Sequence, residues 1–172
     1  MNTDYSMDIP TSVGKSLKEL SHEKPVLLVF LRHFGCIFCR EALKDISSKR
    51  ASFEEKGVQV VLVHMSDDKT AESYFKKYNL EGITHIPDPQ CKYYASFGLV
   101  KGSFNQLFGL KNWLRGVELT MKGTPVSLKQ IGDGFQMPGI FMIRNGRVAD
   151  SYIHKSAADR PDYDNIIACC AA

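Results

Sequence analysis

The chain has 172 residues, of which 44% are hydrophobic and 24% are charged, and its formal net charge at pH 7 is +3. These values are typical of a globular protein, so we expect one domain spanning residues 1–172. Lysine and arginine are spread without a dense basic run, which argues against nucleic-acid binding. No apolar run is long enough to cross a bilayer and the first residues lack a signal-peptide pattern, so we predict no membrane partner and a cytoplasmic location.

Residues 1–24 form a polar N-terminal extension, for which we expect a short helix within Val13–Leu20 that covers a sheet edge. The next segment, Val26–Leu31, is a continuous run of apolar residues with the length of a strand. Such a run without alternation is typical of a strand that is buried on both faces.

A C-x-x-C motif follows this strand and begins a segment with helical spacing. If the helix starts near Cys36, the unpaired N–H groups and the positive end of its dipole favour a thiolate there. Arg32, His33 and Arg40 are expected to add positive charge nearby. The sequence therefore predicts a redox-active dithiol, Cys36 and Cys39.

The helical spacing separates the two sulfurs. One mostly apolar stripe of the helix carries Cys39, Leu43, Ile46, Arg50 and Phe53. We therefore expect Cys39 to point towards the core and Cys36 to stay at the surface. Cys36 would then attack a substrate, and Cys39 would resolve the product.

Three other interpretations of the motif are open. Half of a zinc site would need two further ligands, and no second C-x-x-C or closely spaced histidine pair follows, so we predict no metal and no other cofactor. Two structural cysteines are possible because free cysteine is often buried. A structural disulfide is less favoured, since five cysteines without a secretory pattern indicate transient sulfur chemistry.

The middle of the chain continues the alternation of strands and helices. Gly57 ends the cysteine helix, and residues 58–65 form a second buried strand, which we expect to lie parallel to the first. The segment Ser66-Asp67-Asp68 supplies the N-cap of a helix whose apolar face runs from Ala71 to Tyr78. The cysteine motif then lies at the carboxyl end of the sheet, where open α/β proteins bind ligands.

Proline and glycine mark the next boundaries. We interpret residues 85–89 as a break, followed by a helix that reaches Gly98 and carries Cys91, either as a third redox thiol or as a packed residue. A further helix is expected over 104–114, and residues 115–136 are expected to be a long loop.

The last segments predict a hairpin and a helix. Residues 140–143 and 148–154 are strands joined by Asn145-Gly146, the dipeptide that a two-residue turn prefers. The segment Asp159-Arg160-Pro161-Asp162 opens a final helix that ends at Cys169-Cys170.

This order of elements, with C-x-x-C at the first strand-to-helix turn, resembles the thioredoxin-like fold. The resemblance implies an α/β protein with a central mixed sheet flanked by helices and a C-terminal β-hairpin and helix. The segments FGCIFCRE (34–41) and PGIFMIRNGRVADSYIH (138–154) are similar to the C-x-x-C subgroup of the alkyl hydroperoxide reductase and thiol-specific antioxidant (AhpC/TSA) family, the peroxiredoxin-like proteins.

The resemblance also implies site residues. It predicts that Met137-Pro138 is a cis bond beside Cys36, and that a substrate-binding surface is formed by Arg32, Phe34, Arg40, Met137 and Pro138. The Ile37-Phe38 dipeptide either forms a hydrophobic lip for a partner or packs Phe38 into the core.

Three functions follow from these residues. The first is a thiol-disulfide oxidoreductase, in which Cys36 attacks a disulfide or oxidised thiol and Cys39 resolves the mixed disulfide. The second is an antioxidant hydroperoxide reductase, which ranks lower because the chain lacks the P-x-x-x-T-x-x-C loop and the pre-hairpin arginine of peroxiredoxins. The third is a non-catalytic binding or redox-sensing module. The expected partners are protein or small-molecule disulfides or hydroperoxides, with the thioredoxin or glutathione system as electron donor.

Overall fold

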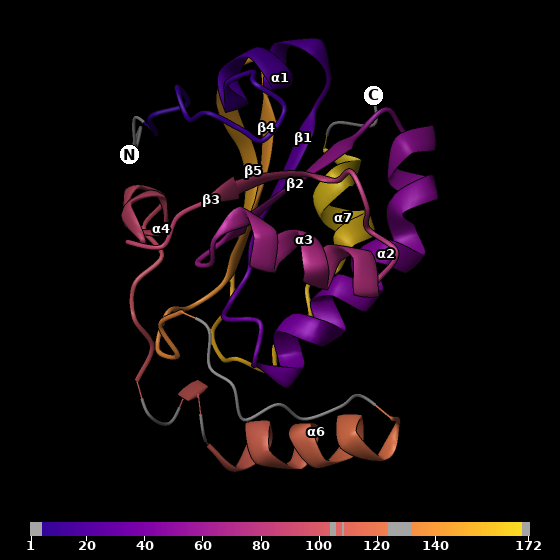
Figure 1. Cartoon of the computed structure of the whole chain (residues 1–172), viewed down its shortest axis with the longest axis vertical. Coiled ribbons are helices and arrows are strands. Elements are labelled where there is room, and N and C mark those ends of the chain that lie inside the picture. The colour runs from indigo at the N-terminus through magenta and orange to yellow at the C-terminus, as the bar shows by residue number, and fades with distance from the viewer. Residues whose placement is uncertain (1–4, 104–105, 108, 124–131, 170–172) are drawn as a thin grey trace.

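The computed structural model describes residues 5–103, 106–107, 109–123 and 132–169. Its centre is a five-stranded sheet of order β3-β2-β1-β4-β5 (Figure 1). The strands are β1 (Val26–Phe30), β2 (Gln59–His64), β3 (Thr84–Pro87), β4 (Gly139–Arg144) and β5 (Arg147–Ile153). β1 pairs in parallel with β2, and β2 with β3, whereas β4 pairs antiparallel with both β1 and β5. The predicted mixed sheet is therefore confirmed.

Helices cover both faces of the sheet. One face carries α2 (Ile37–Glu55), α3 (Asp68–Lys77) and α7 (Tyr163–Ala168), and the other carries α1 (Leu17–Glu23) and α4 (Lys92–Ser96). α6 (Leu110–Met121) lies beyond the sheet, below the end of the molecule where α2 begins (Figure 1). None of the helices in the described ranges combines the length and the apolar character that crossing a membrane requires.

β1 divides the core in two because successive side chains of a strand point to opposite faces. Leu27 and Val29 pack under α2, while Val26, Leu28 and Phe30 pack on the α1 side. All five residues are buried, as the unbroken apolar run predicted. Burial of one such side chain contributes about 1.5–3 kcal/mol, so this strand anchors both layers.

The N-terminal extension covers the edge strand. The backbone N–H of Ser12 donates to the His85 carbonyl at 2.9 Å, and the His85 N–H donates to Ser12 Oγ at 3.0 Å. α1 follows with Ser16 as its N-cap, in a capping box with Glu19. The extension therefore covers the edge through Ser12, whereas the helix, which begins at Leu17 and not at Val13, packs on a face of the sheet and not at the edge as expected.

Two expectations about the middle of the chain are wrong. The break expected at residues 85–89 contains most of β3, which pairs with β2. This strand is short and ends at Pro87, a residue that sheets accept at their edges. The loop expected over 115–136 begins as helix, because α6 continues to Met121. Residues 104, 105, 108, 124–131 and 170–172, including part of the expected helix, part of this loop and Cys170, lie outside the described residues.

α6 is amphipathic, although its glycine and its β-branched residues lower the helix propensity of its sequence. Asn112 and Leu119 are buried, whereas Trp113 and Met121 are exposed. Arg115 pairs with Glu41 of α2, with Nη2 2.6 Å from Oε1. Tertiary contacts of this kind override a weak local propensity.

The hairpin and the final helix match their predictions. Asn145 and Gly146 form the β4–β5 turn with φ values of 51° and 72°, which only a few residue types adopt readily. Asp162 is the N-cap of α7, and its side chain accepts from the Asn165 N–H. The hairpin lays β4 beside β1, so that the first residue of β4, Gly139, is opposite Phe30, the last residue of β1.

Candidate active site

Cys36 is the N-cap residue of α2, at the carboxyl end of β1. Its carbonyl accepts the Arg40 N–H at 3.2 Å, which begins the helix. Nη1 of Arg32 donates to the Cys36 sulfur at 3.0 Å. The sulfur therefore receives positive potential from both the helix terminus and the guanidinium. Only 9% of Cys36 is exposed, so the expectation of a surface thiol is wrong: the turn and the Arg32 side chain cover it.

The Arg32 guanidinium is held by the segment that precedes β4. Its Nε donates to the Gln136 carbonyl at 3.3 Å, and its Nη2 donates to the Gly134 carbonyl. The Gln136 amide in turn donates to the Leu99 carbonyl at 2.9 Å. Arg32 itself is 6% exposed. Three contacts in a buried setting therefore fix the planar group against the Cys36 sulfur.

Cys39 lies in the first turn of α2 and faces the core, as predicted. It is 3% exposed, and its thiol donates to the Arg32 carbonyl at 3.7 Å. Burial raises the pKa of Cys39 far above the usual range for a thiol, and a negative charge on Cys36 raises it further. Cys39 is therefore a neutral thiol in the reduced protein.

His33 does not contribute the positive charge that the sequence suggested. Burial lowers its pKa to about 4, and the charges of Arg32 and Arg40 act in the same direction. The imidazole is therefore neutral at pH 7. The basic character of the turn comes from the two arginines alone.

Phe34 and Arg40 hold the turn together and do not face a substrate. Phe34 is 1% exposed and stacks on Tyr74, with ring centroids 4.6 Å apart. Arg40 is buried, and its Nε donates to the Phe34 carbonyl at 3.2 Å. Both were predicted to contact the substrate, and this state of the protein gives them a positioning role.

Met137 and Pro138 close the other side of the site. Met137 is buried against Leu107 and Ala157, so its side chain has no exposed surface that a substrate could contact. The described residues contain no cis peptide bond, so the prediction for Met137-Pro138 is wrong. The Met137 N–H donates to the Val100 carbonyl at 3.3 Å, and this contact fixes the segment in the path that leads into β4.

A small pocket of about 40 Å³ opens beside Cys39. Its walls include Phe38, Cys39, Glu41, Pro138, His154 and Arg160. This volume has room for water or a small oxidant but not for a large ligand. Phe38 is half-buried and packs against both the main core and Met137, so the core interpretation of this residue and the lip interpretation both apply in part.

Charged residues at the pocket rim were not anticipated from the sequence. Arg160 Nη2 lies 2.6 Å from Asp45 Oδ2, and Arg160 Nε lies 3.6 Å from Glu41 Oε1. The Glu41 carboxylate also binds Arg115. The partners are 74 to 119 residues apart in the chain, so no local pattern indicates them.

Comparison with known proteins extends this description. A model of the AhpC/TSA family matches residues 9–151. A thioredoxin-like protein of Arabidopsis thaliana, AAED1, chloroplastic, is 26% identical over 164 residues, which are 90% of this chain and 66% of that protein. Peroxiredoxin-like 2C of Bos taurus is 31% identical over 87 residues, 49% of this chain and 37% of that protein. The chain thus matches less than two thirds of the length of either relative.

The fold also has solved counterparts. The crystal structure of the peroxidoxin BcpB from Mycobacterium tuberculosis superimposes with a TM-score of 0.63 at 17% identity, covering 94% of this chain and 88% of that one. The likeness shows that the mixed sheet and its helices have the thioredoxin-like arrangement expected from the sequence.

Proposed function

The chain belongs to the AhpC/TSA family, and from this premise we propose that it is a thiol-based oxidoreductase in which Cys36 is the nucleophile and Cys39 the resolving thiol. One observation carries the proposal: the 3.0 Å contact between Arg32 Nη1 and the Cys36 sulfur, at the N-terminus of α2. A guanidinium and a helix terminus stabilise a thiolate, which is the reactive form.

The favoured reaction is thiol-disulfide exchange. The Cys36 thiolate attacks one sulfur of a partner disulfide, forms a mixed disulfide and releases the other partner sulfur as a thiolate. Cys39 then loses its proton and attacks the Cys36 sulfur, which releases the second partner thiolate and leaves a Cys36–Cys39 disulfide. Two electrons pass to the partner, and a thiol donor such as the thioredoxin or glutathione system returns them.

The burial of Cys39 supports this order of events. Burial is the main cause that keeps Cys39 protonated, and a negative Cys36 sulfur adds to it because the two charges would repel. When Cys36 becomes part of a mixed disulfide, this second cause is lost and Cys39 is more easily deprotonated.

Hydroperoxide reduction is the second candidate. The Cys36 thiolate would attack the terminal oxygen and form a sulfenic acid while an alcohol or water leaves, and Cys39 would then condense with it to release water. The low exposure of Cys36 favours a small oxidant, and the small pocket adjoins the resolving Cys39 and not Cys36 itself. The absence of the peroxiredoxin threonine and pre-hairpin arginine places this reaction second, although Arg32 supplies positive charge from the other side of the turn.

A cytoplasmic location belongs to the same proposal. Five cysteines, an odd number, are better suited to transient sulfur chemistry in a reducing compartment than to a full set of disulfides.

Paired rate measurements test the proposal. Reduction of an insulin-like disulfide and stopped-flow consumption of hydrogen peroxide are compared for the wild type, Cys36→Ser and a Cys91→Ser control. We expect disulfide exchange that Cys36→Ser abolishes and Cys91→Ser retains, with a peroxide rate near that of a free thiolate. A much faster peroxide reaction would select the second candidate, and no reaction with either substrate would leave only a binding or sensing module.

A further inference from the structure

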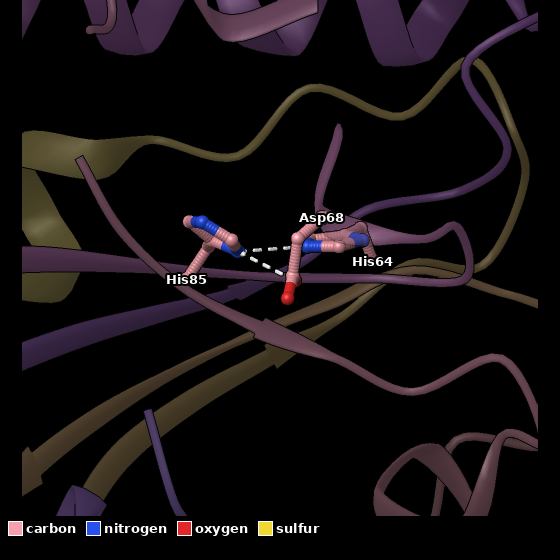
Figure 2. Close-up of side chains that lie close together, drawn as sticks. All are labelled: His64, Asp68 and His85. Atoms are coloured by element: carbon pink, nitrogen blue, oxygen red, sulfur yellow. Dashed lines mark hydrogen bonds and ion pairs between the residues drawn. The ribbon is translucent and has the colours of Figure 1, made fainter. Parts of the chain in front are cut away.

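Two histidines meet inside the protein, one at the carboxyl end of β2 and the other within β3. His64 is the last residue of β2, and His85 lies in β3 opposite Leu62, so both side chains project from the same face of the sheet. Their exposed fractions are 0% and 4%. His64 Nε2 and His85 Nδ1 are 3.0 Å apart (Figure 2). Ring nitrogens of two neighbouring strands therefore converge on one point.

Two carboxylates of α3 approach this point from outside. Asp68 and Glu72 lie one turn apart, on the same side of the helix. Asp68 Oδ1 is 3.7 Å from His85 Nδ1, and Glu72 Oε1 is 4.0 Å from His85 Nε2. Both carboxylates are more than half exposed, so the buried nitrogens can be reached from solvent along the Asp68 side chain, which Figure 2 shows next to them.

The outer partners of the two rings bias their tautomers. Ser66 Oγ lies 3.2 Å from His64 Nδ1, on the side away from His85. If His64 donates its Nδ1 proton to Ser66, its Nε2 carries a lone pair. Asp68 lies near His85 Nδ1 and Glu72 lies near His85 Nε2, so the two carboxylates do not fix the tautomer of this ring. With the proton on His85 Nε2, lone pairs of both rings face each other, and a cation can lie between them.

We propose that His64, His85 and Asp68 bind a divalent transition-metal cation of the zinc class, with water or Glu72 completing the coordination. The ligand atoms lie within 4.8 Å of one another. Zinc–nitrogen bonds of 2.0–2.1 Å place tetrahedral ligands about 3.3 Å apart, so the two rings need to separate by only a few tenths of an ångström. Two imidazoles and a carboxylate, with an open fourth position, form a donor set that zinc accepts.

This site is distinct from the cysteine motif. The two histidines are 21 residues apart in the sequence, so no H-x-x-x-H spacing indicates them. Phe34 lies between the site and the thiol turn, with its ring centroid 6.0 Å from that of His64. The proposal does not depend on the activity of Cys36.

Zinc binding to a Cys36→Ser/Cys39→Ser protein tests the proposal, because this background removes the dithiol as a competing ligand. Equilibrium dialysis should give one zinc per chain, and Asp68→Asn should weaken the affinity at least about tenfold. Glu81→Gln, which removes an exposed carboxylate beyond α3, is the matched control and should bind like its parent. Asp68 is exposed, so its substitution should leave the fold intact, and zinc should raise the melting temperature of the parent but not of Asp68→Asn.

Cobalt provides a second readout that identifies the donor atoms. Ligation by His64, His85 and Asp68 should give visible d–d bands without thiolate-to-cobalt charge-transfer bands. Charge-transfer bands would assign the metal to the remaining cysteines and overturn the proposal. Absence of stoichiometric zinc, or equal affinity in Asp68→Asn and Glu81→Gln, would also overturn it and would mean that His64 and His85 share only a structural hydrogen bond.

Discussion

Arg32 Nη1 lies 3.0 Å from the sulfur of Cys36, and the same guanidinium is held by the backbone carbonyls of Gly134 and Gln136. Cys36, the N-cap of α2 and the proposed nucleophile, is therefore connected to the segment that precedes β4. The state of the thiol depends on contacts between parts of the chain that are more than 100 residues apart.

Replacing Arg32 by methionine should slow alkylation of Cys36 by iodoacetamide at pH 7. A hydrogen bond to a charged group is worth about 1.5–3 kcal/mol, so the expected decrease is about tenfold to a hundredfold. Arg50→Met, which removes a half-buried arginine further along α2, should leave the rate unchanged. Equal rates in both variants would mean that Arg32 does not stabilise the thiolate.

The two motif cysteines should react in a fixed order. Iodoacetamide should label Cys36 first and Cys39 only at much higher pH, because burial raises the pKa of Cys39 far above the usual range. Peptide mapping by mass spectrometry after alkylation at a series of pH values measures both rates. Faster labelling of Cys39 would reverse the assigned roles.

Much of this site could be predicted from the sequence, because the local signals were strong. The apolar run of β1 and the helical spacing after Cys36 placed the dithiol at a strand-to-helix turn. No local pattern in the sequence indicated the contacts between distant segments. The carbonyls that hold Arg32 and the carboxylates that bind Arg160 are fixed by the tertiary fold alone.

The features that the sequence did not predict also depend on contacts between distant segments. β3 has only four residues and owes its structure to pairing with β2. α6 contains Gly116 and β-branched residues, and it docks through the pair between Arg115 and Glu41. His64 and His85 come together only because two neighbouring strands place them on one face of the sheet.

Arg115→Met should weaken the packing of α6 against α2. The Glu41 carboxylate, only 11% exposed, would lose its 2.6 Å partner and keep Arg160 at 3.6 Å. We expect a loss of about 1–2 kcal/mol in unfolding free energy, between the values for exposed and buried pairs. Hydrogen exchange should accelerate within α6 and not in β1, whereas Arg147→Met, at an exposed position of β5, should have no effect. Unchanged exchange in α6 would show that the pair does not anchor this helix.

Acid should destabilise the protein in part through His154. Burial lowers the pKa of this imidazole to about 4 in the folded state, from 6.5 when unfolded. Between these values the unfolded chain binds a proton that the folded chain does not, so stability falls as the pH decreases from 6.5 to 4. His154 lowers the free energy of unfolding by at most about 1.4 kcal/mol for each pH unit in this range. The partial exposure of the ring reduces this effect.

The substitution His154→Leu should flatten this pH dependence. The His154 Nδ1 atom is buried and has no hydrogen-bond partner among the residues that the structure describes, so an apolar side chain of similar size should be tolerated. Urea unfolding at pH 7, 6 and 5 measures the effect, with exposed His22→Leu as the control. An unchanged slope in His154→Leu would show that this residue does not carry the effect.

Mass-spectrometric mapping of sulfur bonds tests the central claim, that Cys36 attacks and Cys39 resolves, most directly. The reduced protein is treated with one equivalent of a small aromatic disulfide. The wild type should form an intramolecular Cys36–Cys39 disulfide, and Cys39→Ser should stop at a mixed disulfide on Cys36. A mixed disulfide on Cys39 in a Cys36→Ser protein at a comparable rate, or stable adducts on Cys91 or Cys169 in place of the Cys36–Cys39 bond, would contradict the account.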